Sequence, residues 1–489
     1  MTALLLVALV GPLVAALANF AAGWRTAGAM MTVLSALGVL TTGVALAIRI
    51  GSEPAILLGG LLRVDALSAT MLIVIGTVGT LATWASIGYI DHELSHGLTD
   101  AKGARLYGTL TPAFLAAMVL AVSANNIGVV WVAIEATTVI TAFLVGHRQT
   151  RTALEATWKY VIVCSVGIAI AFLGTVLLYY AALHAGAPAE QALNLDVLAG
   201  YASRLDPGVA RLAGGLLLIG YGAKVGLVPF HTWLADAHSQ APAPVSALMS
   251  GVLLSVAFSV LIRVKPVIDV AVGSGYLRTG LLVVGIATLA IAALMLTVTP
   301  DLKRMLAYSS MENMGLIAIA LAAGTSVAIA ALLLHVLAHG IGKTVLFLAG
   351  GQLQAAHGST EIAAITGVLS SSRLIGYCFA AGSIILLGLP PFAMFASELA
   401  IARSLSEAGL SWALAGAMLM IAIAFAALLR NTGRMLFGDR EPEATRIAVP
   451  ATIAMALLTG IAAALLLGVT AGPLSGLLHA AATTVGGLR

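Results

Sequence analysis

Three titratable residues recur at a fixed spacing in a long apolar segment. In LLLHVLAHGIGKTVLFLAGG, His335, His339 and Lys343 follow one another at intervals of four residues, which places them on one face of a helix, about 6 Å per step. Histidine titrates near neutral pH, so this row predicts a proton relay with intervening waters. Two histidines four residues apart also fit a metal site, but the segment lacks the glutamate of an HExxH motif.

Three further charges lie inside or beside apolar segments, where each is expected to cost about 2.5–3.5 kcal/mol. Glu135 lies in IGVVWVAIEATTVITAFLV, Lys224 lies five residues before Pro229, and Glu398 follows the double proline of LLGLPPFAMFASE. Prolines break helices, and broken helices at membrane depth can line a water-filled cavity. We therefore expect proton transfer at all three. The structural alternatives are that Glu135 or Glu398 is a carboxylate paired with a neighbouring group, and that the Lys224 side chain extends to the membrane surface.

Four weaker candidates have serious structural alternatives. His231 and His238 follow the first proline break, in HTWLADAHSQAPAPVS, and fit a proton entry, a metal site or plain loop structure. No third ligand lies at a suitable spacing, so we predict no metal. Lys265 ends an apolar segment beside Arg263 and fits either a relay or an interfacial anchor. Glu312, in DLKRMLAYSSMENMGL, fits either a functional or a structural role.

The composition indicates a membrane protein. Of the 489 residues, 60% are hydrophobic and only 9% are charged, whereas a soluble domain has about 25% charged residues. The two cysteines, Cys164 and Cys378, lie in apolar segments outside any CxxC pair, which excludes a disulfide scaffold and disfavours iron–sulfur clusters. The net charge of +4 is too small and scattered for nucleic-acid binding, and no Walker A or GxGxxG motif indicates a nucleotide. We expect no cofactor.

Fourteen apolar runs are each near the length needed to cross a hydrocarbon layer of about 30 Å. We therefore predict an all-α polytopic membrane protein with about 14 transmembrane helices. The first run lacks a charged start and a clear cleavage point, so we expect a retained helix rather than a signal peptide. The runs are 2–22, 28–50, 65–87, 108–123, 126–146, 158–184, 210–227, 243–264, 277–299, 305–323, 327–350, 374–396, 409–430 and 448–471.

Basic residues between the spans favour one orientation, because cytoplasmic loops are enriched in Lys and Arg. We predict both termini outside and a location in the inner (plasma) membrane of the cell. With that orientation the outside loops have chiefly Arg49, Arg63, Arg204, Arg211, Arg278 and Arg403, whereas the inside loops have Arg25, Lys102, Arg105, Arg148, Arg151, Lys303, Arg304, Arg373, Arg430, Arg434, Arg440 and Arg446.

The two proline breaks, at 224–242 and 388–398, recur five spans apart, and each lies next to an ionisable residue. Interrupted segments at corresponding positions of two halves are typical of inverted-repeat transporters. We therefore predict two inverted five-helix repeats with broken helices 7 and 12. The expected units are 1–107 with helices 1–3, 108–265 with helices 4–8, 266–430 with helices 9–13, and 431–489 with a loop and helix 14.

Three sequence blocks resemble one family of membrane proteins. AKVGLVPFHTWLADAHSQAPAPVSALMSG is similar to the signature of the proton-conducting, antiporter-like membrane subunits, as are DLKRMLAYSSMENMGL and LHVLAHGIGKTVLFLAGG. Such subunits occur in respiratory complex I, Mrp-type cation/proton antiporters and membrane-bound nickel–iron hydrogenases of the formate-hydrogenlyase type. The resemblance covers roughly residues 65–430, and GLPPFAMFASE is most similar to hydrogenase-associated members. Asn313 stands where a histidine is common in the family.

The resemblance implies a proton-translocating subunit of a multi-subunit redox complex, without a catalytic redox site of its own. Its partners would be other membrane subunits and soluble redox subunits with iron–sulfur and nickel–iron centres. The alternatives are a subunit of an Mrp-type Na⁺(K⁺)/H⁺ antiporter, a membrane subunit for inorganic-carbon uptake, or a mainly structural anchor. The implied proton-transfer residues are the pair Glu135 and Lys224, the central relay of Lys265, His335, His339 and Lys343, and the exit Glu398.

Overall fold

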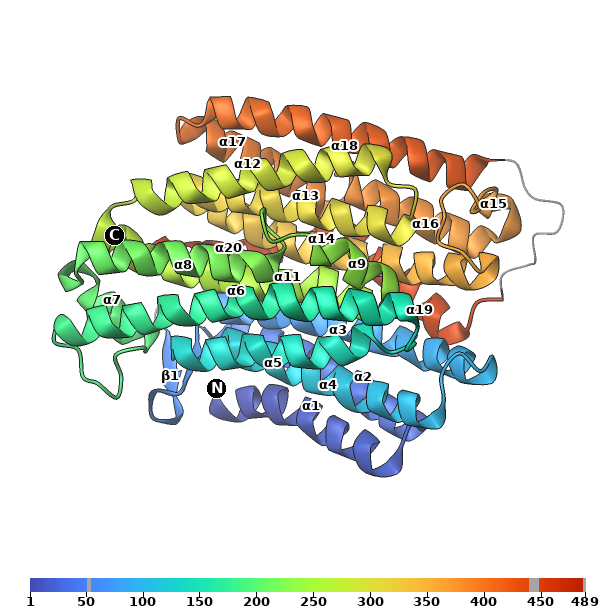
Figure 1. Ribbon diagram of the computed structural model, residues 1–489, viewed down its shortest axis with the longest axis horizontal. Coiled ribbons are helices and arrows are strands. Elements are labelled where there is room, and N and C mark those ends of the chain that lie inside the picture. Colours follow the sequence, from blue (N-terminus) through green and yellow to red (C-terminus); the bar gives the residue numbers. More distant parts are fainter. Residues whose placement is uncertain (51–53, 439–447, 487–489) are drawn as a thin grey trace.

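The protein is a bundle of long helices that lie side by side and run across the view in Figure 1. A computed structural model describes residues 1–50, 54–438 and 448–486. Thirteen helices in this part of the chain are long and apolar enough to cross a membrane. They are α1 (Thr2–Ala22), α2 (Thr26–Arg49), α3 (Ala66–Ser95), α4 (Ala101–Ser123), α5 (Ile127–Val145), α6 (Arg151–His184), α8 (Pro207–Val225), the continuous helix Ala243–Val272, α12 (Gly275–Val298), α13 (Leu302–Ala323), α14 (Ser326–His357), α18 (Ser411–Phe437) and α19 (Ala451–Val469).

Several shorter elements complete the described chain. The helix Ala243–Val272 consists of α10 (Ala243–Leu248), a π-helical turn η3 (Met249–Leu253) and α11 (Leu254–Val272). The expected twelfth span is divided into α16 (Arg373–Leu386) and α17 (Ala393–Glu407). The others are an antiparallel hairpin of β1 (Ala55–Leu57) and β2 (Leu62–Val64) around η1 (Leu58–Gly60), and α7 (Leu195–Tyr201), η2 (Ala202–Arg204), α9 (Trp233–Gln240), α15 (Val368–Ser371) and α20 (Gly472–Gly486).

The predicted all-α polytopic fold is confirmed. Within the described ranges, thirteen continuous spans and the divided span of α16 and α17 match the expected count of about 14 transmembrane helices. Helices 7 and 12 are broken where prolines were expected to break them, after α8 and between α16 and α17. The inverted relation of the two five-helix units stays a prediction.

Several helix boundaries differ from the expectation. The α4 helix begins at Ala101 rather than 108, because the side chain of Asp100 caps its first turn and polar residues extend it beyond the apolar run. The α11 helix continues through Pro266 to Val272, since a proline inside a membrane helix is tolerated where neighbouring groups satisfy the freed carbonyl. The expected unit boundaries after residues 107 and 265 therefore fall inside helices.

The C-terminal helix α20 was not expected from the sequence. It has 15 residues, fewer than the ~20 residues that a membrane span needs, so its sequence does not predict a span. It follows α19 and packs against α3, α11 and α14, and its residues Leu478, Ala481 and Ala482 are buried. The hairpin of β1 and β2 was likewise unexpected, because strands of three residues leave no clear alternation in the sequence.

The core of the bundle consists of four spans that are almost wholly buried: α3, the helix Ala243–Val272, α13 and α14. The spans α1, α6, α12, α18 and α19 lie at the periphery, and less than half of each is buried within the protein. Hydrocarbon can cover such an apolar exterior, but it offers no partner to a buried charge. The histidine and lysine row of α14 is therefore enclosed by protein.

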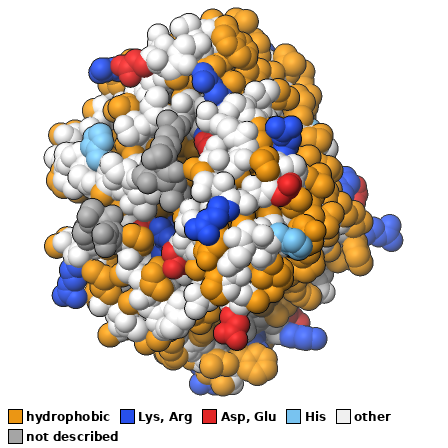
Figure 2. Space-filling view, turned by 90° about the vertical axis from the view of Figure 1, so that its left-hand side faces the viewer, with side chains coloured by type: hydrophobic (Ala, Val, Ile, Leu, Met, Phe, Trp, Pro, Cys, Tyr) orange, Lys and Arg blue, Asp and Glu red, His pale blue; other side chains and the backbone are white. Residues whose placement is uncertain are grey.

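The bundle has two ends, and the one at which the chain begins is called the N-terminal face. The N-terminal face is the end at which α1, α3, α5 and α14 begin, on the left of Figure 1, and Figure 2 looks onto it. Charged side chains are scattered over this face, some of them next to a group of opposite charge, among hydrophobic and uncharged groups. The opposite face has the loops predicted to be inside, but Arg440 and Arg446 lie outside the described residues.

A buried ion pair joins three spans at the N-terminal face. Asp65, the N-cap of α3, accepts two bonds from the guanidinium of Arg263 on α11, at 2.7 and 3.0 Å. Arg263 also donates to Ser68 Oγ at 2.7 Å, and Ser68 donates to the carbonyl of Val122 on α4 at 3.0 Å. Arg63 contacts the same carboxylate at 2.8 Å. The cluster therefore holds the start of α3 against the end of α4 and against Arg263 of α11.

The charge of Asp65 is strongly favoured in the folded protein. Burial alone would raise the pKa of this carboxyl, but the charges of Arg263 and Arg63, together with the hydrogen bonds from Arg263 and Ser68, hold it well below its usual value. Because the pKa is lower in the folded state than in the unfolded state, the stabilisation is complete above the ordinary carboxyl pKa. It is lost as the pH falls through the folded pKa.

We expect Arg263→Met to destabilise the protein by about 3 kcal/mol at neutral pH, because removal of one partner from a buried ion pair costs about 3–5 kcal/mol and Arg63 remains. The measurement is the apparent unfolding temperature in mild detergent. Lys159→Met is the matched control, since Lys159 is half exposed in its ion pairs and surface pairs contribute about 0–1 kcal/mol. The deficit of Arg263→Met should shrink in acid, and equal effects of both variants would contradict the prediction.

Candidate functional site

The first lysine site lies where α8 ends. Gly226, in the left-handed conformation with φ 84°, terminates α8 one residue after Val225 and allows the chain to leave the helix axis. The preceding Lys224 is fully buried. Its Nζ donates to Thr138 Oγ1 at 2.8 Å and to Tyr160 Oη at 2.6 Å, and lies 4.8 Å from the centre of the Tyr160 ring. The ammonium therefore has hydroxyl and aromatic partners.

Glu135 lies near this lysine without touching it. It is on α5, three residues before Thr138 and so about one helical turn away. Ser165 Oγ donates to its Oε1 at 3.3 Å, and its buried Oε2 has no hydrogen-bond partner within the described chain. No ion pair closer than 4.0 Å joins Glu135 to Lys224, both of which are described. The expected pair is thus two neighbouring groups that do not touch, and Thr138, a partner of Lys224, lies about one turn from Glu135.

The second lysine site begins a chain of polar contacts between α13 and α14. The fully buried Lys343 donates to the carbonyl of Leu306 at 2.6 Å and to Ser309 Oγ. Asn313, one turn further along α13, donates to the carbonyl of Ser309 at 2.6 Å and contacts His335 Nε2 through its Oδ1 at 2.7 Å. Asn313 therefore links Lys343 to the histidine row.

The chain continues from the histidine row to the twelfth span. Nδ1 of His335 contacts the hydroxyl of Ser397 on α17 at 3.0 Å, and Ser397 directly precedes Glu398. Glu398 is half-buried and lines a mostly apolar cavity of about 160 Å³ between α13, α17 and α18. Polar contacts thus extend from Lys343 to the residue beside Glu398.

Two buried histidines lack partners in the described chain. Neither ring nitrogen of His339 or His238 has a hydrogen bond. The ring of His339 is parallel to that of His335, with centroids 6.4 Å apart, a separation that one water can bridge. On α9, His238 stacks on Phe347 with centroids 5.3 Å apart, one turn along α14 from Lys343. Since α9 follows the break of α8, the chain that leaves the first lysine site brings His238 close to the second.

The two helix breaks have the same local construction. Gly388 after α16, like Gly226 after α8, has a positive φ, here 61°. Proline follows each glycine within three residues, and a new helix begins at Trp233 and at Ala393. A Cβ atom on Gly388 would lie 2.4 Å from Oε2 of Glu398. The second break therefore leaves room for a carboxylate, as the first leaves room beside a lysine.

Lys265 lies apart from the central row. It forms an ion pair with Asp269, one turn later on α11 and close to the N-terminal face. Ile329 lines the same small cavity as this pair, and His335 is six residues further along α14, about 9 Å in depth. Lys265 is therefore nearer to the N-terminal face than the expected central relay.

The remaining expected candidates lie at the edges of these clusters. His231 is half-buried within the break that separates α8 from α9, and Glu312 is half-buried on α13 beside Asn313. The described residues contain no group of three His, Cys, Asp or Glu side chains placed to hold a metal ion.

The uncharged partners of the buried charges are not evident from the sequence, where only Asn313 stands out, as a departure from the family pattern. They are Thr138, Tyr160, Ser309, Asn313 and Ser397. Hydroxyl side chains are common in membrane helices because they can bond to their own backbone, so their type alone gives no signal. Their spacing was informative, since Thr138 lies three residues after Glu135 and Asn313 directly follows Glu312.

A buried carboxylate at the opposite face was also missed. Glu93 is 1% exposed and contacts His147 Nε2 at 3.0 Å and Arg148 Nε at 2.8 Å. Arg148 also donates to Tyr89 Oη at 3.1 Å. Glu93 lies at the end of the third span, in a segment expected to be a polar loop, because α3 extends about two turns beyond its apolar run.

Comparisons with known proteins place the chain among similar membrane subunits. A family model described as NADH:quinone oxidoreductase/Mrp antiporter, TM, matches residues 124–436, more than half of the chain. The hydrogenase-4 component F homolog of Methylacidiphilum infernorum is 36% identical over 394 residues, which cover 80% of this chain and 82% of that protein.

Solved structures show the same fold. A chain of the membrane-bound sulfane sulfur reductase, an archaeal respiratory membrane complex, superposes with a TM-score of 0.89 and 23% identity over 99% of this chain and 98% of that chain. A chain of the Mrp complex from a Dietzia species gives a TM-score of 0.84 and 22% identity over 99% and 98% of the two chains. Both chains belong to multi-subunit membrane complexes.

We expect Gly388→Ala to move the Glu398 carboxylate out of the second break, because the new methyl group would overlap it and a positive φ costs about 1–2 kcal/mol for a residue other than glycine. The measurement is the rate at which an apolar carbodiimide labels Glu398, followed by mass spectrometry, and the rate should rise. Gly416→Ala on α18, where a Cβ meets nothing within 4 Å, is the control. An unchanged rate in Gly388→Ala would contradict the geometry.

Proposed function

Because the chain belongs to the NADH:quinone oxidoreductase/Mrp antiporter transmembrane family, we propose that it is the proton-translocating membrane subunit of a redox complex of the membrane-bound hydrogenase type. The hydrogenase-4 relative, at 36% identity, supports this type. The proposed partners are other membrane subunits and soluble redox subunits with iron–sulfur and nickel–iron centres. We place the complex in the inner (plasma) membrane with the N-terminal face outside, which the basic loops of the opposite face support.

The observation on which the proposal depends is the pair of fully buried lysines, Lys224 and Lys343. Their described hydrogen-bond partners are hydroxyl and carbonyl oxygens rather than carboxylates. An ammonium held only by neutral groups in a low-dielectric site is sensitive to any charge that moves nearby. Each lysine is therefore suited to take up and release a proton when its surroundings change.

From Lys343 to Ser397 the proposed path follows the polar contacts. A proton held at Lys224 is stabilised by the negative charge of Glu135, about one turn of α5 away. When a neighbouring subunit alters that influence, the proton moves by way of His238 to Lys343. From there the path runs through Ser309 and Asn313 to His335 and then to Ser397 and Glu398, with water bridging the gaps. The residues of the proposed path, all within the described ranges, are Glu135, Lys224, His238, Lys343, Ser309, Asn313, His335, Ser397 and Glu398.

The driving energy would come from the redox subunits. Moving one charge against a membrane potential of 100 mV requires about 2.3 kcal/mol, and a change of one pKa unit corresponds to about 1.4 kcal/mol. A rearrangement around Glu135 that changes proton affinity by a few units is therefore sufficient. The hydroxyl groups of Thr138 and Tyr160, which accept hydrogen bonds from Lys224, are where such a rearrangement would act.

We expect Lys224→Met to lower proton translocation by about 10²-fold or more, the loss typical for removal of a group that transfers protons. The tagged complex is purified in mild detergent, its subunits are identified by mass spectrometry, and proton uptake is measured in vesicles with a pH-sensitive dye. Lys159→Met, which removes a half-exposed lysine on α6, is the control and should translocate normally.

Two outcomes would contradict the proposal. Normal proton uptake by Lys224→Met in an intact complex would exclude the lysine from the path. Co-purification of small membrane subunits alone, with no redox protein and with Na⁺-dependent proton exchange, would favour the cation/proton antiporter instead.

A further inference from the structure

The ion pair of Lys265 and Asp269 has an unusual feature. Their side chains are 7% and 8% exposed, and only one carboxylate oxygen is used. The other, Asp269 Oδ1, is buried and has no hydrogen-bond partner in the described chain. Buried polar atoms are almost always satisfied, so this oxygen is free to accept a proton or a hydrogen bond from water.

A cavity leads to this pair from the N-terminal face. Its volume is about 390 Å³, and it lies between the start of α3, α7, α11 and α20. A smaller cavity of about 30 Å³, lined by Lys265, Asp269 and Ile329, adjoins it, and both cavities share Pro266 and Val485. A water needs about 10–15 Å³ of such volume, so the small cavity can hold water next to Asp269.

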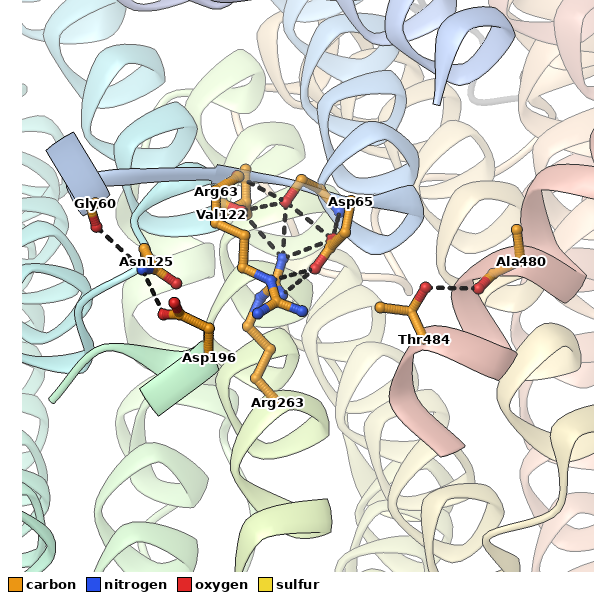
Figure 3. Close-up of polar contacts among 10 residues, drawn as sticks. Gly60, Arg63, Asp65, Val122, Asn125, Asp196, Arg263, Ala480 and Thr484 are labelled. Atoms are coloured by element: carbon orange, nitrogen blue, oxygen red, sulfur yellow. Dashed lines mark hydrogen bonds and ion pairs between the residues drawn. The ribbon is translucent and has the colours of Figure 1, made fainter. Parts of the chain in front are cut away.

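The walls of the large cavity carry balanced charges among apolar residues. Arg63, Arg263 and Asp65 form its inner wall, and Asp196 lies at its rim, where Asn125 donates to it at 2.8 Å. Figure 3 shows the pair of Asp65 and Arg263 in the centre, with Asn125 and Asp196 on one side and Thr484 of α20 on the other. Two arginines face two aspartates, so the lining does not repel a cation.

We propose that this cavity is a vestibule through which protons pass between the aqueous phase at the N-terminal face and the carboxylate of Asp269. A proton from vestibule water binds Oδ1 of Asp269, which neutralises the carboxylate and releases Lys265 from its ion pair. Loss of the proton restores the pair. The vestibule is a second port, distinct from Glu398 on α17, and translocation requires both ports in series, so closing the vestibule stops it.

The helix α20 is a necessary wall of this port. Thr483, Thr484 and Val485 line the large cavity, and Val485 also lines the small one. Val485 therefore lies at the constriction between the two cavities. A bulky or charged group attached next to it would close the path from the vestibule to Asp269.

The inference rests on the proposed function, and the test separates the two. Thr484→Cys is made in the full complex, in which the native Cys164 and Cys378 are buried. A membrane-impermeant, positively charged methanethiosulfonate reagent is added to one side or the other of sealed vesicles. We expect Thr484→Cys to be labelled from the N-terminal face only, and labelling to reduce proton translocation to near background.

Ser406→Cys is the matched control, because Ser406 is exposed near the end of α17 at the same face and outside the cavity lining. It should be labelled from the same side without loss of translocation. Labelled Thr484→Cys with full translocation would overturn the vestibule, as would a thiol that cannot be labelled from that side.

A second variant tests Asp269 without chemical labelling. Asp269→Asn should assemble normally and lose translocation, and Asp269→Glu should restore part of it, because only an ionisable group can exchange the proton. Full activity of Asp269→Asn would overturn the role of the pair. If Lys224→Met translocates normally while labelled Thr484→Cys does not, the proposed path fails and the vestibule stands.

Discussion

Every charge inside a hydrocarbon layer must find its polar partners within the protein, since lipid supplies none. The described ion pairs of this chain all lie near the two ends of the bundle, as with Asp65 and Arg263 at one end and Glu93 and Arg148 at the other. In the middle, Lys224 and Lys343 are held by hydroxyls and carbonyls instead. Ion pairs stabilise the two ends of the bundle, whereas the two lysines in its middle are not held in ion pairs.

Two breaks in the helices make such a middle possible. A continuous helix uses its carbonyls internally, but a break leaves backbone ends and space beside it. Gly226 places the end of α8 next to Lys224, and Gly388 makes space for the carboxylate of Glu398. The short helix α9 then places His238 against α14, one turn from Lys343. Local backbone geometry therefore decides which polar groups meet across the bundle.

The sequence was sufficient to predict the spans, both breaks and the buried charges, because apolar length, proline and an isolated charge are strong local signals. It could not show that Asn313 links Lys343 to His335, or that Lys265 bonds to Asp269. Those contacts depend on how α13, α14 and α11 rotate and on where α11 ends. The helix α20 was missed because its length falls below that of a span.

The separation between Lys265 and the central row has a physical consequence. About 9 Å of depth along α14 lies between Ile329 and His335, and Leu332 and Leu333 are buried apolar residues within this interval. An apolar interval between a polar vestibule and a polar centre prevents protons from leaking freely, since a proton crosses it only when water enters. A pump requires such a barrier, because a continuous polar path would dissipate the membrane potential that it works against.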